Sequence, residues 1–358
     1  MREIIKWVSE ALAAKDIGPA MTHYSVAGGL IRASNGKITA AHPWPDDAEF
    51  LVSGMEFEKV LARMEGDEPT VTVNEATEKT KGSVTIRSGR FHATIDTLPV
   101  DSWLYPGVDD ASWLSIPKGF VDVLRSLRAF ISDNPAQAWA GCVALEDGNC
   151  YATNNIAVAG CACAVGGVQA LLPAYAVDFL LRRVEGLESW AWSENYVAFK
   201  WSTGAWVRSQ LVIGKFPERA ASLVREAYDA QPTQEITDEF RAAFADVAGL
   251  AEDTIHIYGD RMESKFKRSV VVAPCECEVP LDKEIEVPIL DKNGKPVLDE
   301  MYEPKTKRKV VPVDCSIWGA AFLAPVISQA THWQPSLWPK PAPFRGENVA
   351  GFIVGRKE

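Results

Sequence analysis

Apolar residues recur at the same helical spacing in two stretches of the chain that lie 120 positions apart. Each stretch places four apolar residues at positions i, i+3, i+4 and i+7, the spacing of one buried helical stripe. The two sets are Phe57, Val60, Leu61 and Met64, and then Val177, Leu180, Leu181 and Val184. The match predicts two equivalent amphipathic helices and therefore an internal repeat.

The residues that follow the two predicted helices are also alike. Each helix is followed by the sequence Glu-Gly-x-Glu, at 65–68 and at 185–188, and then by alternating residues that predict a strand. Two further extended runs follow in each copy, separated by a Ser-Gly or a Thr-Gly turn. Short amphipathic helices can resemble each other by chance, but the shared spacing, ends and hairpins together indicate a repeat.

Another helix and another hairpin precede each of these helices. The expected helices span 2–14 and 117–132. The hairpins that follow them turn at Asn35-Gly36 and Asp147-Gly148, dipeptides that favour two-residue turns. Each copy therefore reads helix, strands, helix, strands.

A fainter third copy occupies the last third of the chain. It offers a helix at 236–249, strands at 254–258 and 267–273, and a closing strand at 345–355. The helical stripe returns with Pro325 expected in the first turn of its helix. The stripe consists of Leu323, Val326, Ile327 and Ala330.

A charged, proline-bearing stretch at 281–312 interrupts the third copy. It contains Asn293-Gly294 and predicts an inserted hairpin. We therefore expect an α+β protein of three repeated helix–sheet–helix–sheet domains, with bounds at 1–110, 111–220 and 221–358.

The composition excludes several broad classes of protein. The chain has 358 residues, of which 47% are hydrophobic and 24% charged, and no apolar run is long enough to span a bilayer. Its first residues mix charges into an amphipathic pattern and lack the features of a signal peptide. Seven cysteines without a Cys-x-x-Cys pair argue against a disulfide framework. We expect a globular protein with reduced thiols in a cytoplasm, not a secreted, membrane-spanning or disordered chain.

The net charge of −11 leaves binding to nucleic acid open. Residues 111–220 hold nine basic and nine acidic side chains, so the middle copy is neutral. Because salt confines electric fields to about 8–10 Å, a negative protein can still carry a local basic face.

Several segments resemble a known family, among them FLVSGMEFEKVLARMEGDEPTVTV of the first copy. The middle copy contains LLPAYAVDFLLRRVEG and YVAFKWSTGAWVRSQLVIGKFPE, and the first contains RSGRFHATIDTLPVDSWLYP, with Tyr105-Pro106 where the middle copy has Phe216-Pro217. In their order and spacing these segments resemble the bacterial DNA sliding clamp, the beta subunit of DNA polymerase III. The resemblance covers most of 1–218 well and the last third weakly.

The resemblance implies a non-catalytic processivity factor without a cofactor. Two chains would form a head-to-tail homodimer, a ring that encircles double-stranded DNA independently of sequence and serves the replicative polymerase and the clamp loader. Helices would line the hole, although basic residues on amphipathic helices are also common on solvated surfaces. The residues expected to face DNA are Arg2, Lys6, Lys59, Arg63, Lys118, Arg125, Arg128, Arg182 and Arg183.

The family also has a pocket for short peptides between its middle and last domains. One wall of that pocket, usually ATDGHRLA, reads ATNNIAVA at 152–159, so the Gly-His-Arg core is replaced. The alternative is that these residues are ordinary core. The residues expected to form the pocket are Thr153, Val158, Pro232, Ile353 and Val354.

No catalytic motif occurs, and none of the five histidines lies at metal-ligand spacing from another. The Cys-x-Cys pairs at 161–163 and 275–277 favour buried core residues over a zinc site, because alternation puts both thiols on one face of a strand. Two alternatives stay open: an open DNA-binding or scaffold protein without ring closure, and a metal or thiol enzyme. The altered pocket segment and the insertion suggest the hypothesis of a clamp from a virus of bacteria or from a distant lineage.

Overall fold

The computed structural model describes residues 1–358 except 65–68, 78–79, 147, 268, 281, 291–294, 298–303 and 357–358. The chain forms two compact units. Unit 1 comprises Met1–Val121 and Ala170–Ile213, and unit 2 comprises Asp122–Gln169 and Gly214–Glu358. Strand β12 (Gln169–Pro173) and helix α3 (Phe120–Arg128) each contain a point at which the chain passes from one unit to the other.

Unit 1 contains one antiparallel sheet of 11 strands. Their spatial order is β5 (Thr70–Asn74), β6 (Ser83–Ser88), β7 (Phe91–Leu98), β4 (Phe50–Ser53), β1 (His23–Ala27), β2 (Leu30–Ser34), β3 (Ile38–Pro43), β15 (Trp206–Gln210), β14 (Tyr196–Trp201), β13 (Leu187–Trp192) and β8 (Leu114–Ser115). Alternation along β1 and β2 buries Tyr24, Val26, Ile31 and Ala33 completely.

Three α-helices pack in unit 1: α1 (Arg2–Ser9), α2 (Gly54–Ala62) and α4 (Ala174–Leu181). The predicted stripes are confirmed at their centres, where Phe57 and Leu61 of α2 and Val177 and Leu180 of α4 are buried. A short 3-10 turn at Val100–Ser102 follows β7.

Unit 2 contains three groups of strands. The first has β9 (Cys142–Glu146), β10 (Asn149–Thr153), β11 (Ala157–Ala162), β25 (Ala350–Ile353), β24 (Ala342–Arg345), β23 (His332–Trp333) and β16 (Gln234–Glu235), side by side in that order. The second has β19 (Ser269–Pro274), β18 (Arg261–Phe266), β17 (Thr254–Ile257) and β22 (Ser316–Gly319), and the third pairs β20 (Asp282–Pro288) with β21 (Thr306–Pro312).

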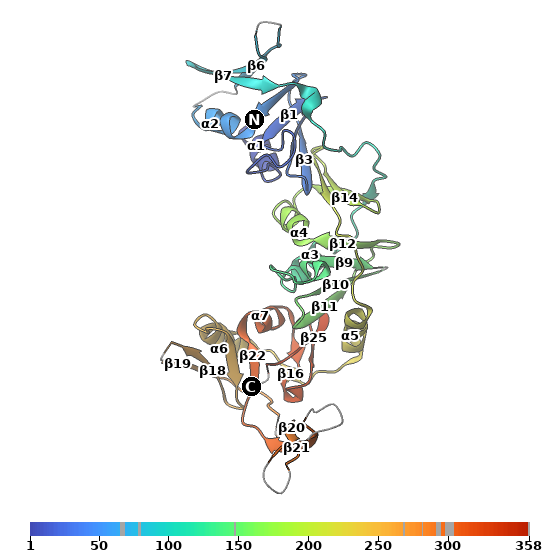
Figure 1. Ribbon diagram of the computed structural model, residues 1–358, viewed down its shortest axis with the longest axis vertical. Helices are drawn as coiled ribbons and strands as arrows, with labels where there is room; N and C mark the ends of the chain where they lie inside the picture. Colours follow the sequence, from blue (N-terminus) through green and yellow to red (C-terminus); the bar gives the residue numbers. More distant parts are fainter. Residues whose placement is uncertain are drawn as a thin grey trace. The chain divides into compact units, whose positions relative to one another are not determined.

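The helices of unit 2 are α5 (Glu218–Asp229), α6 (Asp238–Ala248) and α7 (Ala320–Gln329), with 3-10 turns at Ala138–Gly141 and Pro335–Leu337. Figure 1 shows α5 and α7 on opposite sides of β11 and β25. Within the described residues, no helix is long and apolar enough to cross a membrane.

Several predicted helices are longer than the observed ones. The helix predicted at 2–14 ends at Ser9, because the Ala13 amide bonds to the Met21 carbonyl at 3.1 Å and turns the chain away. The helix predicted at 117–132 spans only Phe120–Arg128, after Gly119, whose positive φ of 78° is not helical.

The third copy differs from the prediction at Pro325, and part of its predicted insertion lies outside the described residues. Pro325 lies inside α7 and not in its first turn. The predicted insertion is present as the β20–β21 pair, whereas its Asn293-Gly294 turn lies outside the described residues. The Glu-Gly-x-Glu sequence at 65–68 and Asp147 also lie outside them.

The repeat is visible in equivalent turns and ladders. The amide of Asn35 bonds to the carbonyl of Ile38 at 3.2 Å, and the amide of Asn154 bonds to the carbonyl of Ala157 at the same distance. One residue after each turn, a strand of one copy pairs with a closing strand of the next. Thr39 lies opposite Arg208, and Val158 lies opposite Phe352.

Candidate functional site

Arg182 and Arg183 follow α4 and share one carboxylate. Their Nη2 atoms lie 2.6 and 2.8 Å from the oxygens of Glu10, the residue that caps α1. The Arg183 guanidinium also lies 4.0 Å from the centre of the Phe179 ring and donates to the Trp7 carbonyl at 3.2 Å. Arg183 is 11% exposed and Arg182 is 56% exposed. Arg183 therefore joins α4 to α1, and Arg182 is the one that a ligand can reach.

The two guanidinium groups set the charge state of Glu10. Partial burial alone would raise the pKa of this carboxyl, but the hydrogen bonds and positive charges of Arg183 and Arg182 outweigh it and lower the pKa. Glu10 is therefore ionised at neutral pH and offsets part of the positive charge beside it.

The basic residues of α1 and α2 have different roles. Arg2 donates from Nε to the Leu61 carbonyl at 3.1 Å and from Nη2 to the carbonyl of Met64, so it satisfies carbonyls that the end of α2 leaves open. Lys6, Lys59 and Arg63 are exposed. Arg2 and Lys6 line a cavity of about 330 Å³ together with side chains of α1 and α2.

The basic residues at α3 lie beside acidic ones. Lys118 is exposed and precedes the helix. Arg125 lies 2.6 Å from the carboxylate of Asp122, and Arg128 lies 3.2 Å from that of Asp133. Arg125 is 57% exposed and Arg128 is 27% exposed, so both guanidinium groups keep contact with solvent.

Strands β10, β11 and β25 bring together four of the five residues predicted for the peptide pocket. Thr153 donates its hydroxyl to the Ala157 carbonyl at 2.7 Å and is 4% exposed. Val158 and Ile353 are 6% and 1% exposed, whereas Val354 is 41% exposed. The Val354 amide bonds to the Ile156 carbonyl at 2.9 Å, which extends the ladder by one step.

Helix α5 packs over one face of this ladder. The Tyr228 hydroxyl donates to the Gly160 carbonyl at 3.1 Å, and a Cβ on Gly160 would lie only 2.5 Å from Val224. Val158 shares this face with Gly160, because residues two apart in a strand point the same way. Val354 is thus the most exposed apolar position of the predicted set.

Pro232 lies elsewhere on the same sheet. It lines a cavity of about 320 Å³ with residues 230–231, 331–332 and 345–347. This cavity is next to β16 and β23, which are separated from β11 by β25 and β24. The structure therefore does not bring Pro232 beside Val158.

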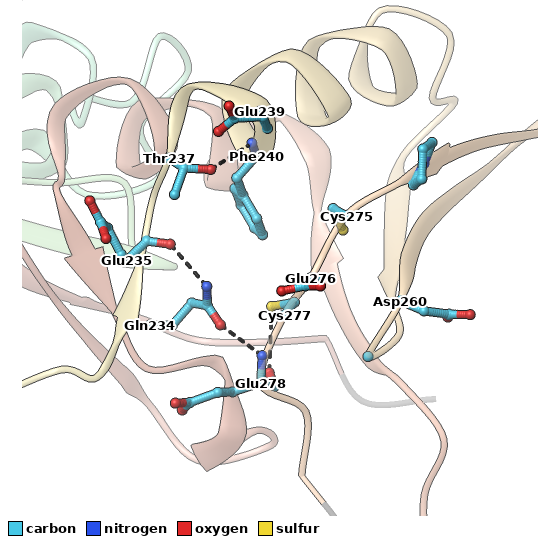
Figure 2. Close-up of a pocket in the computed structure, with 12 residues that line it drawn as sticks. Gln234, Glu235, Thr237, Glu239, Phe240, Asp260, Cys275, Glu276, Cys277 and Glu278 are labelled. Carbon is cyan, nitrogen blue, oxygen red and sulfur yellow. Dashed lines mark hydrogen bonds between the residues drawn. The ribbon is translucent and has the colours of Figure 1, made fainter.

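An acidic cavity of about 1080 Å³ lies between β16, the start of α6 and the segment 274–278 (Figure 2). The Gln234 side chain accepts from the Glu278 amide at 2.8 Å across it. The negative charge of its carboxylates disfavours the binding of a phosphate backbone in this cavity. They belong to Glu235, Glu239, Asp260, Glu276 and Glu278.

The thiols of this cavity are protonated at neutral pH. Burial raises the pKa of Cys275 to about 11 and raises that of Cys277 further. Cys161 and Cys163 are also buried, as predicted, although β11 ends at Ala162, and Cys275 of the other pair is only half-buried. Within the part of the chain that the structure describes, no group of three or more His, Cys, Asp or Glu residues is arranged to hold a metal ion.

Two open strand edges were not predicted from the sequence. In β19, which ends its sheet, Val270 and Val272 are 57% and 52% exposed. In β7, only Thr97 and Leu98 pair with β4, so among the described residues the stretch Phe91–Asp96 forms a ladder with β6 alone. The run Ser-Val-Val-Val-Ala at 269–273 was the available signal, because a strand with apolar residues on both faces needs cover on both.

Comparison with known proteins gives a consistent result at the level of structure. No protein-family model and no curated protein sequence matches the chain. The DNA polymerase III subunit beta from Pseudomonas aeruginosa is similar with 12% identity and a TM-score of 0.72, over 99% of this chain and 97% of that one. The Caulobacter crescentus pol III beta is similar with 13% identity, a TM-score of 0.72 and the same coverage.

The Helicobacter pylori beta clamp bound to a DNA ligase peptide is also similar, with 12% identity, a TM-score of 0.67 and coverage of 99% and 97%. The likeness spans the last third of the chain as well, where the sequence resemblance is weak. The fold expected from that resemblance is confirmed: this chain has the fold of the bacterial DNA sliding clamps.

Proposed function

We propose that this protein is a DNA sliding clamp, which closes into a ring around duplex DNA as a head-to-tail homodimer. The observation that carries the proposal is the repeated pairing of copies through equivalent strands. The first copy pairs with the second through β3 and β15, and the second pairs with the third through β11 and β25. Among the described strands, one edge of β19 is unpaired, and one edge of β7 is unpaired over Phe91–Asp96.

The repeat predicts the register of the missing junction. Val270, Thr39 and Val158 each come one residue after the pair of residues that closes a turn. The closing pairs are Phe266 with Ser269, Asn35 with Ile38, and Asn154 with Ala157. In the partner strands β15 and β25, the residues opposite Thr39 and Val158 are Arg208 and Phe352. They lie four positions before Val212 and Arg356.

The amides of Val212 and Arg356 bond to the strand that leads into the second helix of their copy. Leu98 pairs with the corresponding strand β4. The equivalent position four residues earlier is Thr94. Val270 of one chain should therefore lie opposite Thr94 of a second chain, and ladder bonds with cover for Val270 and Val272 would hold the ring closed.

The basic helix residues supply the attraction for DNA in this proposal. A sliding ring needs only contacts to phosphates, which carry no sequence information and fall off with salt. We assign this role to Lys6, Lys59, Arg63, Lys118, Arg125 and Arg182, which are exposed, and to Arg128, which is 27% exposed. Arg2 and Arg183 act mainly by holding the helices in place, because Arg2 bonds to carbonyls at the end of α2 and Arg183 bonds to Glu10 and the Trp7 carbonyl.

The same proposal includes protein partners. The exposed Val354 and its neighbours on the β11–β25 ladder would receive short peptides from the replicative polymerase and the clamp loader, in a bacterial cytoplasm. The three domains keep the proposed bounds 1–110, 111–220 and 221–358. The role is non-catalytic, since the ring acts by topology.

The test is the mass of the protein in solution, measured by light scattering over a concentration series. We expect about 78 kDa, twice the 39.2 kDa of one chain. Val270→Asp should give the monomer, because it places a charge in the junction. The matched control Val310→Asp, which changes a valine that is also 57% exposed, should leave the dimer intact.

A monomer at every concentration would contradict the closed ring. In that case the alternative, an open DNA-binding or scaffold protein, would replace it. Retention on circular DNA separates the two, since only a closed ring stays on a circle and leaves it when the circle is cut.

A further inference from the structure

The β20–β21 hairpin is an addition to the repeat. Equivalent strands are joined by six residues in the first two copies, 44–49 between β3 and β4 and 163–168 between β11 and β12. In the third copy the equivalent strands β19 and β22 are joined by 41 residues, 275–315, which contain the hairpin. Its strands pair only with each other among the described residues. The hairpin is therefore not needed to complete the sheet of its copy.

The second strand of this hairpin is strongly basic. Residues 304–313 contain four basic and no acidic side chains, whereas the paired strand β20 contains Lys283 and the acidic residues Asp282, Glu284 and Glu286. The described side chains of 304–310 are all exposed. The basic residues are Lys305, Lys307, Arg308 and Lys309.

The ladder divides these charges between the two faces of β21, and Arg308 lies opposite Glu286 of β20. Lys307 and Lys309 point to one face of β21, because residues two apart in a strand share a face. Two steps along a strand span about 7 Å. One strand of duplex DNA presents a phosphate for about every 3.4 Å of helix axis, so two lysines at this separation are about two phosphate steps apart along the axis.

The base of the hairpin is tied to the body of unit 2. The Lys283 ammonium lies 5.0 Å from the centre of the Trp338 ring, within range of a cation–π contact. Trp338 is 3% exposed, and its indole N–H donates to the carbonyls of Ile317 and Arg356 at 3.1 and 3.0 Å. Figure 1 shows β20 and β21 projecting from the other strands of unit 2.

We propose that this hairpin is an arm that binds the phosphate backbone of duplex DNA through Lys305, Lys307 and Lys309. The inference rests on the proposed function, which brings duplex DNA to the chain. Residues 304–313 contain no aromatic side chain on which unpaired bases could stack, which favours a duplex over a single strand. Because the arm belongs to one copy only, it adds contacts to those of the helices.

The test compares two charge-reversed variants of the full-length protein on a fluorescent 20-base-pair duplex. The arm variant carries Lys307→Glu and Lys309→Glu. The control carries Lys215→Glu and Lys340→Glu, two exposed lysines of the same unit outside the arm and the proposed DNA-facing set. The affinity of each is measured by anisotropy between 50 and 200 mM salt.

We expect the arm variant to bind more weakly than the control and its salt slope to fall by about 2, since each phosphate contact contributes about 0.9. The milder double change Lys307→Gln and Lys309→Gln should also bind the duplex more weakly than the control. An equal slope for arm variant and control would overturn the arm. So would weaker binding that a single strand of the same length shows equally, because that result points to a different ligand.

Dimer mass distinguishes failure of the arm from failure of the clamp. A dimer that stays on circular DNA, with equal slopes for both variants, would refute the arm alone. A monomer in which the arm variant still loses duplex affinity would refute the ring and keep the arm.

Discussion

The carboxylate of Glu10 lies 2.8 Å from the guanidinium of Arg183, and this ion pair joins the first helix of the first copy to the second helix of the middle copy. The Arg183 side chain is 11% exposed, so it has little access to water as an alternative partner. Trp7 packs edge-on against Phe179 and Trp201, at centroid distances of 5.5 and 5.2 Å, beside the pair. The contact joins α1 to the end of α4 beside Trp201 of β14.

Glu10→Gln should therefore destabilise the protein. The amide keeps the shape of the side chain but leaves Arg183 without a charged acceptor, which costs about 1–2 kcal/mol. Urea unfolding measures the loss. Glu3→Gln, at an exposed position in the first turn of the same helix, should cost at most a few tenths of a kcal/mol. Equal effects of the two changes would show that the ion pair contributes nothing specific.

The same carboxylate predicts a pH dependence. Because the folded protein lowers the pKa of Glu10 below its ordinary value of 4.5, the unfolded state binds the proton more tightly. The stabilisation is thus complete above pH 4.5 and is lost as the pH falls through the lower folded value. The difference in unfolding free energy between wild type and Glu10→Gln should be constant from pH 7 to about 5 and shrink towards pH 3. A difference that grows on acidification would have the wrong sign.

The exposed end of the β11–β25 ladder gives a test of peptide binding. Val354→Asp puts a charge on an apolar position that is already 41% exposed, so the fold should survive. We expect at least a tenfold loss of affinity for a labelled peptide from the replicative polymerase that the proposed clamp would serve, measured by anisotropy. Val184→Asp, at a position that is 36% exposed outside the ladder, is the control. If both variants bind like wild type, the ladder is not the peptide site.

Local patterns predicted much of the fold because the repeat shows each element more than once. The stripes at Phe57 and Val177 and the turn at Asn35 follow from spacing and turn chemistry alone. Helix ends were less predictable, since a distant carbonyl decides where α1 stops. Propensity also failed at Pro325, which lies within α7 although it cannot donate a backbone hydrogen bond.

The candidate site was harder to predict than the fold. A basic residue on an amphipathic helix looks the same in sequence whether it faces DNA or bonds to a neighbouring helix. Arg2 and Arg183 show the second case, because each is directed by carbonyls or a carboxylate far away in the chain. Val158 shows a similar limit, since its burial depends on α5, which covers the ladder from a separate segment.

The two faces of the sheet in unit 2 provide the sharpest test of which helices face DNA. Phe130, just after α3, stacks on Phe344 at 5.6 Å. Phe344 pairs with Gly351, and Gly351 pairs with Ala159, so all three share a face. Gly160, the next residue, points to the other face, which α5 covers. The α3 and α5 helices therefore lie on opposite sides of one sheet.

Reversal of Arg125 and Arg128 to Glu should consequently weaken retention on circular DNA and lower its salt dependence while the dimer stays intact. The control reverses Arg219 and Arg225 on α5, which are 74% and 55% exposed and ion-paired to acidic residues of their own helix, as Arg125 is. Both variants change the net charge equally, so bulk repulsion cancels in the comparison. Equal losses would mean that charge alone governs retention, and a larger loss for the α5 variant would place DNA on the opposite side of the sheet.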